Sequence, residues 1–325
     1  MKEPNNVNDE EEEKPRPTIA NGKYEAERVL CCTAGPISFY LIKWVGYNMG
    51  SCTWEHIENF ECPDLIAEYK LRWRALQMLA HRYGYDVPEN LEAYYRSPPA
   101  VSLIAFERQI HCVCYAYDQA KLFVENWVDK GKKPSNFQFA LENTYSEDAK
   151  NILENFRPIN IIKDEDRVVL KGRQIPLILF KTKQKGWGIF AAARISAGIF
   201  ICEYVGHVTT RKEALALNEP TYSFDMARGE NGGDPIFTIM AQNRGNEARF
   251  FNHSCVPNVV VRYLKMDFDN GLYNRIAYFS LKNIEMGEEL TINYFGDVRN
   301  TERKRNGEFK HLCQCGEKRC LKAFG

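Results

Sequence analysis

The spacing of apolar and polar residues divides the chain into parts with different periodicities. In residues 24–31 and 38–45 the two kinds of residue alternate, which predicts two β strands, and a third short strand is predicted at 53–55. From Pro63-Asp64 onward the apolar residues recur at helical spacing, at Leu65, Ile66, Tyr69 and Trp73. The first part is therefore predicted to be three small strands closed by one helix.

Helical periodicity dominates the middle of the chain. Residues 101–129 repeat apolar side chains at helical spacing, and residues 147–156 favour another short helix. We interpret residues 81–165 as a helical linker region that packs on its neighbours. The run His111-Cys112-Val113-Cys114 offers metal-binding side chains, but on a helix they point in different directions, so core packing is the favoured interpretation.

Strand-like patterns return after residue 165. Residues 167–170, 175–180 and 200–206 are predicted strands. Between them, Lys185-Gly186-Trp187-Gly188 combines glycines, which let the backbone approach a ligand closely, with an aromatic anchor. Farther on, residues 249–258 place two aromatic residues before an amide, an imidazole, a hydroxyl and a thiol.

These segments, with Glu288–Tyr294 and three C-terminal cysteines, resemble the SET domain of protein lysine methyltransferases. Within that family they most resemble the suppressor-of-variegation class, which methylates the ninth residue of histone H3. The resemblance runs from about Arg167 to the C-terminus, with the motifs in the family's order. It implies an α+β, strand-rich SET domain at 166–297, with a knot-like active site, followed by a zinc-bound post-SET tail at 298–325.

The resemblance also implies roles for single residues. S-adenosylmethionine is expected against Lys185, Gly186, Trp187, Tyr222, Asn252 and His253. Tyr294 is the expected catalytic phenol, and Tyr204 and Tyr222 are candidates for the substrate-lysine channel, although either tyrosine could be an ordinary strand residue. Methyl transfer from a sulfonium to a neutral amine requires in-line positioning, which an aromatic channel and an oriented phenol can provide.

The cysteine spacing indicates one metal site. Cys313, Cys315 and Cys320 are one ligand short of a tetrahedral zinc site, and the resemblance assigns Cys255 as the fourth ligand. The alternative is three free surface cysteines. The suppressor-of-variegation class normally carries nine cysteines around three zinc ions before its SET domain. This interval has only Cys112 and Cys114, so that cluster cannot form, and the linker helices are the candidate replacement brace.

Residues 23–80 resemble a chromodomain, through the segments 24–30, 40–47, 53–55 and 62–66. The resemblance implies that Tyr24, Trp44 and Tyr47 form an aromatic cage for methyllysine, a poorly hydrated cation that ring faces attract. It places Asn59 and Glu61 beside the bound histone tail. The alternative is that the three rings fill a small core. Trp54 is the predicted core tryptophan.

Composition narrows the compartment and the partners. Lysine plus arginine equals aspartate plus glutamate, at 43 each, so no overall positive field draws the chain to DNA. A histone H3 tail and nucleosomes are the expected partners, and no sequence-specific DNA binding is expected. The sequence shows no membrane-length apolar run and no signal-peptide pattern, and its eleven cysteines favour a reducing compartment, the cytosol or the nucleus. The resemblance implies the nucleus and chromatin. Residues 1–22 form an acidic tail predicted to be disordered, which either solubilises the protein or attracts basic histone segments.

The sequence therefore predicts a nuclear histone H3 lysine methyltransferase that reads the mark it writes, in heterochromatin formation and gene silencing. Two alternatives remain: a catalytically inactive methyllysine reader, and a methyltransferase of a non-histone protein. Ile292 stands where the family has Phe or Tyr, which favours di- or trimethylation. Asn293 and Met240 replace aspartates of the family, and Met240 favours the non-histone alternative. Degree of methylation, oligomeric state and autoinhibition stay open.

Overall fold

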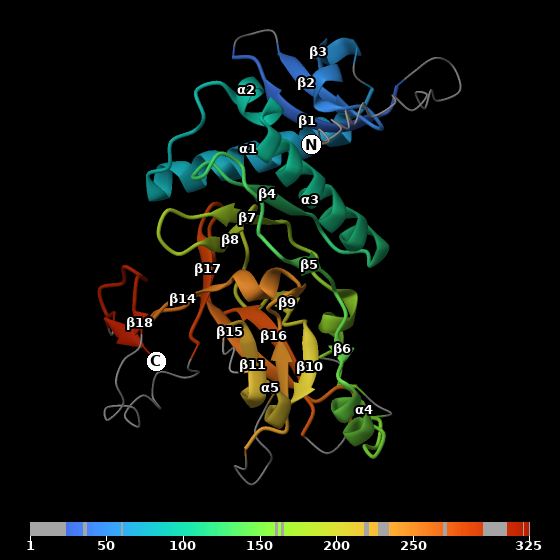
Figure 1. Ribbon diagram of the computed structural model, residues 1–325. Coiled ribbons are helices and arrows are strands. Elements are labelled where there is room, and N and C mark those ends of the chain that lie inside the picture. Colours follow the sequence, from blue (N-terminus) through green and yellow to red (C-terminus); the bar gives the residue numbers. More distant parts are fainter. Residues whose placement is uncertain are drawn as a thin grey trace, which may run out of the picture. The chain divides into compact units, whose positions relative to one another are not determined.

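The computed structural model describes residues 24–34, 38–59, 61–159, 162–163, 166–217, 221–226, 234–268, 272–294, 311–320 and 322–324 (Figure 1). The acidic tail predicted at 1–22 lies outside these residues. The chain divides into two compact units, residues 1–69 and 70–325. No helix among the described residues has both the length and the apolar character needed to cross a bilayer.

The first unit contains a three-stranded antiparallel sheet in the order β1-β2-β3, made of β1 (Ala26–Cys32), β2 (Phe39–Trp44) and β3 (Thr53–His56). Two single turns of 3-10 helix flank β3, η1 (Met49–Ser51) and η2 (Ile57–Asn59). Helix α1 (Pro63–Tyr83) begins in this unit, and its Tyr69 packs edge-on against Tyr40 at 6.0 Å between ring centroids. The predicted strands and closing helix are therefore present.

Trp54 was predicted to be the core tryptophan, and this prediction is wrong. Trp54 is 37% exposed because β3 is a short edge strand, which pairs with β2 alone among the described strands. The core is formed instead by buried residues of the other two strands and of the helix: Val29, Leu30, Cys31, Tyr40, Leu41, Ile42, Ile66 and Tyr69.

The second unit is built on a five-stranded sheet in the order β14-β17-β8-β7-β4. Its strands are β4 (Leu122–Glu125), β7 (Leu177–Lys181), β8 (Trp187–Ala191), β14 (Asn252–His253) and β17 (Glu289–Ile292). Side chains alternate between its faces. Leu177 and Leu179 belong to the cluster that includes residues of α3 (Pro98–Ala116), whereas Ile178 and Phe180 join the cluster that includes residues of α1. Helices thus cover both faces of this sheet, α3 of the linker region on one face and the second half of α1 on the other.

Four smaller sheets complete the unit. The order β11-β12-β10-β6 joins Ser223–Asp225, Phe237–Met240, His207–Thr210 and Thr144–Tyr145, and the order β15-β16-β9 joins Val259–Leu264, Arg275–Ser280 and Phe200–Glu203. Two pairs remain, β13 (Arg244–Gly245) with β5 (Gln138–Phe139), and β18 (His311–Leu312) with β19 (Ala323–Phe324). Short helices lie between strands, α5 (Arg211–Leu217) and the 3-10 helix η4 (Glu247–Phe250). The strand-rich α+β prediction is confirmed.

The linker contains strands as well as helices. Helices α2 (Leu91–Arg96), α3 and α4 (Glu147–Leu153) are present, but the helix predicted over 101–129 ends at Ala116. After a left-handed residue at Asp118, with φ 50°, residues 122–125 form β4, parallel to β7. The linker also supplies β5 and β6 to the other sheets. A four-residue apolar run does not by itself indicate a helix or a buried strand, because its conformation depends on whether a neighbouring strand is available for pairing.

Two further predictions concern short motifs. The strand predicted at 167–170 is wrong: Arg167–Lys171 forms the 3-10 helix η3, which ends at Gly172 in a left-handed conformation, with φ 67°. The run 111–114 lies on α3 as predicted. There Cys114 is buried, Cys112 is exposed, and the His111 imidazole bonds the carbonyl of Leu122 at 2.9 Å.

Candidate active site

The segment 252–258 is fixed to β17 by backbone and side-chain hydrogen bonds. Asn252 and His253, as β14, pair in parallel with Thr291 and Ile292. The Asn258 side chain accepts from the Thr291 amide at 2.8 Å and donates to the Glu289 carbonyl at 2.8 Å. The amide and imidazole predicted to bind the cofactor therefore lie beside the strand that leads to Tyr294.

The β7–β8 loop, residues 182–186, is closed by one threonine. The Thr182 hydroxyl donates to the Gly186 carbonyl at 2.8 Å and accepts from the Lys185 amide at 2.9 Å. Gly186 has φ 76°, a conformation that favours glycine. At Gly188 a Cβ atom would lie 2.9 Å from the side-chain amide nitrogen of Asn252 and 3.1 Å from a carboxylate oxygen of Glu289, so a larger residue would displace these two side chains. Residues 185–187 and Asn252, which are distant in sequence and predicted to share one site, are brought together.

Glu289 connects these groups, although sequence reasoning gave it no role. Its carboxylate accepts from the Asn252 amide at 2.8 Å and pairs with the Lys185 ammonium at 2.9 Å. Asn252 also donates to the Trp187 carbonyl at 3.2 Å. Glu289 is only 8% exposed, and a buried carboxylate must be paired. An acidic residue at the start of a buried strand was the signal that could have identified it.

The three predicted tyrosines lie in one region. The Tyr204 hydroxyl donates to the Tyr222 carbonyl at 2.7 Å, and the Tyr294 hydroxyl donates to the Phe251 carbonyl at 2.9 Å. Burial raises the pKa of Tyr204 and of Tyr294, and the nearby Tyr222 phenol raises the pKa of both further. Tyr204 and Tyr294 are therefore neutral hydrogen-bonding phenols at physiological pH.

His253 and Arg249 complete this region. His253 accepts from the Tyr294 backbone amide at 3.3 Å, and burial, followed by the charge of Lys185, lowers its pKa, so the imidazole is neutral at pH 7. The Arg249 guanidinium lies 3.9 Å from the ring centroid of Tyr222, which has a left-handed backbone with φ 60°. The sequence motif assigns no role to Arg249, whose guanidinium packs against the Tyr222 ring.

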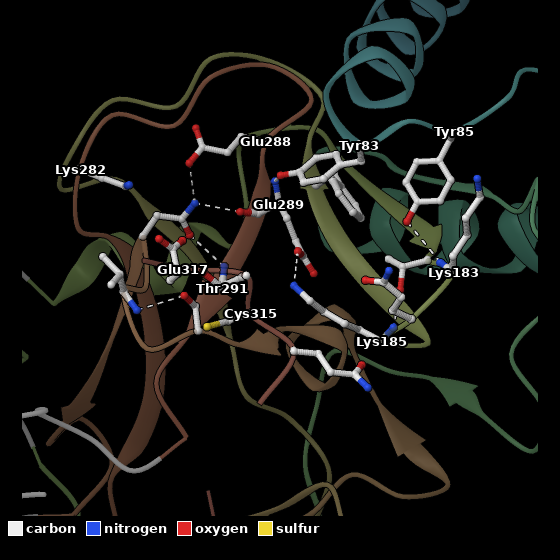
Figure 2. A pocket seen from close by; sticks show the side chains of 18 residues that line it. Tyr83, Tyr85, Lys183, Lys185, Lys282, Glu288, Glu289, Thr291, Cys315 and Glu317 are labelled. Carbon is white, nitrogen blue, oxygen red and sulfur yellow. Dashed lines mark hydrogen bonds and ion pairs between the residues drawn. The ribbon is translucent and has the colours of Figure 1, made fainter. Parts of the chain in front are cut away.

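A cavity of about 380 Å³ lies beside Lys185 and Glu289. Its wall includes Lys185, Glu289 and Cys315, together with Tyr83 and Tyr85 from the end of α1 and the turn after it (Figure 2). Among the residues predicted to bind the cofactor, Lys185 is the one that lines this cavity. The volume is in the range of small-molecule sites.

Four thiols form a candidate metal site. The Sγ atoms of Cys255, Cys313, Cys315 and Cys320 all lie within 4.8 Å of one another, and those of Cys255 and Cys313 are 3.8 Å apart. Tetrahedral zinc with bonds of about 2.3 Å requires sulfur separations of about 3.8 Å, so the four residues fit the ion. Burial alone would raise the pKa of Cys315, but backbone hydrogen bonds from Cys255 and Glu317 outweigh it and lower that pKa to about 7. Burial raises the pKa of the neighbouring Cys313 to about 12, so Cys315 is the more readily ionised of these two thiols.

The three predicted cage residues of the first unit are neighbours. The ring centroid of Tyr24 lies 6.2 Å from that of Trp44 and 5.8 Å from that of Tyr47, with edge-to-face angles of 62° and 84°. The Trp44 indole donates to the Thr53 hydroxyl at 3.0 Å. Tyr24 is 44% exposed, so the group is open to a ligand. Asn59 and Glu61 are exposed.

Comparisons with known proteins agree with these two parts. Residues 24–72 match the Chromo (CHRromatin Organisation MOdifier) domain family, and residues 186–295 match the SET domain family. The chain is 27% identical, over 79% of its length and 74% of the relative, to the histone-lysine N-methyltransferase SUV39H1-A of Danio rerio. It is 34% identical to the histone H3 lysine-9 specific enzyme of Schizosaccharomyces pombe, over 48% of this chain but 34% of that protein.

A solved structure shows the same fold. Arabidopsis thaliana SUVH6, crystallised in complex with S-adenosylmethionine, superposes with a TM-score of 0.53 at 23% identity. The match covers 70% of this chain and 59% of that one. The predicted chromodomain and SET domain are confirmed.

Proposed function

We propose that this protein, in which a chromo domain precedes a SET domain, is an S-adenosylmethionine-dependent methyltransferase of a histone H3 lysine, the ninth residue. The observation that carries the proposal is the convergence of Tyr204, Tyr222 and Tyr294 beside Asn252 and His253. These residues are spread over 91 positions of sequence, from 204 to 294. Their proximity in the fold is therefore not a result of closeness in sequence. The names of the two relatives supply the substrate class.

The roles of the cofactor residues follow from their contacts. Bound S-adenosylmethionine would supply the methyl group as a sulfonium. The 185–187 backbone and the Asn252 amide, held by Glu289, offer polar groups for its amino-acid part. His253 is neutral and does not repel a cation.

Tyr294 is the residue assigned to chemistry. Its phenol stays protonated and is directed at the Phe251 carbonyl, so a neutral dipole faces the site where the substrate amine must be aligned. The lysine must lose its proton to solvent before attack, which a desolvated site promotes by lowering the pKa of the amine. Tyr204 and Tyr222 are assigned to the walls of the lysine channel. The buried Ile292 side chain cannot hold a water as a tyrosine hydroxyl would, which supports di- or trimethylation.

The four-thiol cluster is proposed to hold one zinc ion. Cys255 follows directly on the Asn-His-Ser segment, whereas the other three thiols belong to the tail. Zinc would therefore attach the tail to the active-site segment. The Tyr24, Trp44 and Tyr47 rings are proposed to bind methyllysine, which would raise the effective concentration of enzyme on nucleosomes already marked. The site of action is then chromatin in the nucleus.

Labelled S-adenosylmethionine and a panel of H3 peptides test the proposal. The protein should label peptides that contain the lysine at the ninth residue of H3 and not those in which arginine replaces that lysine. Tyr294→Phe should reduce turnover at least about 100-fold because it removes the aligning phenol. Tyr115→Phe, which alters an exposed phenol on α3, should retain full activity. Labelling of non-histone proteins alone, or full activity in Tyr294→Phe, would refute the respective assignment.

A further inference from the structure

We propose that Tyr83 and Tyr85, at the end of α1, are positioning residues for the cofactor site; this inference rests on the proposed function. Both tyrosines line the cavity beside Lys185 and Glu289. Each hydroxyl accepts a hydrogen bond from a backbone amide, in a segment that positions predicted cofactor residues. The linker would then contribute to cofactor affinity as well as to stability.

The first contact is between Tyr83 and β17. The Glu289 amide donates to the Tyr83 hydroxyl at 2.9 Å, while the Tyr83 ring packs edge-on against Phe190 of β8 at 5.6 Å between centroids. The Glu289 side chain in turn holds both Asn252 and Lys185. Tyr83 therefore fixes the backbone of the residue whose carboxylate orients two cofactor groups (Figure 2).

The second contact is between Tyr85 and the 182–186 loop. The Lys183 amide donates to the Tyr85 hydroxyl at 3.3 Å, and the Lys183 ammonium donates to the Gly84 carbonyl at 3.1 Å. The Tyr85 ring packs against Phe180 at 5.0 Å, at the end of β7. Thr182 and Gly186 close this loop around Lys185, so Tyr85 holds the loop from outside.

The local sequence explains why both tyrosines face the sheet. Gly84 adopts a left-handed conformation, with φ 67°, and the Tyr85 amide bonds back to the Ala80 carbonyl at 3.0 Å. This is the Schellman ending of a helix, which reverses the chain within two residues. Helix α1 packs closely against the turn before β17, since a Cβ on Gly287 would be 2.7 Å from the Leu79 amide nitrogen.

The hydroxyls of Tyr83 and Tyr85 stay protonated over the working pH range. Burial raises the pKa of Tyr83 to about 12 and also raises the pKa of Tyr85. Both remain neutral and accept the two amide hydrogens. Replacing either with phenylalanine removes the acceptor and leaves the ring packing, so the substitution isolates the hydrogen bond.

The experiment measures binding of S-adenosylhomocysteine to the full chain by isothermal calorimetry, together with kcat and KM. Tyr83→Phe should weaken binding and raise the KM for S-adenosylmethionine by about three- to tenfold, the worth of one buried hydrogen bond. The kcat at saturating cofactor should stay within about twofold, since the reacting groups are unchanged. Tyr85→Phe should shift the same constants in the same direction.

The matched control is Tyr94→Phe, on α2 of the same linker. The Tyr94 hydroxyl donates to the buried Glu125 carboxylate at 2.7 Å, and neither residue lines the cavity beside Lys185 and Glu289. This variant should lose thermal stability and keep its cofactor affinity. Unchanged affinity in Tyr83→Phe, or an equal loss in Tyr94→Phe, overturns the inference and leaves the proposed function intact. Absence of S-adenosylhomocysteine binding in the unaltered protein overturns both.

Discussion

Glu247→Gln is expected to destabilise the second unit strongly. Glu247 opens the 3-10 helix η4 that leads into Phe251, and its carboxylate accepts from the Arg173 guanidinium at 2.7 Å, with both side chains 0% exposed. Arg173 also donates to the carbonyls of Lys121 and Ile175 at 3.0 Å each. Glutamine keeps the shape of glutamate and removes its charge, so the substitution leaves a guanidinium buried without a counter-charge.

The magnitude follows from that burial. Breaking one partner of a buried ion pair costs about 3–5 kcal/mol, since the remaining charge cannot be resolvated. For a unit of this size each kcal/mol lowers Tm by about 2–4 °C, which predicts a decrease of about 6–20 °C. Urea unfolding followed by tryptophan fluorescence and near-UV circular dichroism gives the free energy of unfolding. The transition of the second unit is the one to compare.

Two companion variants make the test decisive. Glu147→Gln makes the same chemical change in an exposed pair, whose Lys150 partner lies at 2.6 Å, and should cost no more than about 1 kcal/mol. The double change Arg173→Met with Glu247→Leu removes both charges and should recover most of the loss. A loss below about 1 kcal/mol in Glu247→Gln would refute the argument that this pair is desolvated.

Three further outcomes are expected. Cys320→Ser should reduce zinc from one ion per chain to a loosely held remainder, measured by mass spectrometry after dialysis, whereas Cys112→Ser should keep the ion. Trp44→Ala should weaken binding of a trimethyllysine peptide at least about tenfold, measured by fluorescence anisotropy, and should leave methylation of a free peptide unchanged. Trp54→Ala should bind the trimethyllysine peptide normally. Burial raises the pKa of Glu203 to about 7, above the ordinary 4.5, so the folded state holds this proton more tightly than the unfolded state does. Stability should therefore fall by up to about 3 kcal/mol as pH rises from about 4.5 to 7, and urea titrations of Glu203→Gln should lack that slope.

The sequence was sufficient for features whose signal is local. The alternating strands of the first unit, the glycine loop before Trp187 and the cysteine spacing all depend on residues close together in the chain. Cys255, as the fourth thiol, and the three tyrosines were assigned through a resemblance. The structure brings the thiols within reach of one ion, while the roles of the tyrosines stay predictions.

Features that depend on distant partners could not be predicted. Residues 122–125 became a strand only because β7 offers an edge for parallel pairing, and residues 167–170 found no such edge. Trp54 is exposed because its strand lies at the border of its sheet. Tyr83 is the last residue of α1, and its contact with Glu289 bridges 206 positions of sequence. Local periodicity contains no information about such pairings.

The unequal origin of the four thiols has a consequence for assembly. Three of them lie between residues 313 and 320, and the fourth is 58 positions before the first of these. Before the sheet has folded and ordered Cys255, the C-terminal tail provides only three sulfur ligands for the ion. Zinc should therefore bind late, after the core has folded. Molecules made when zinc is scarce should be folded but catalytically inactive.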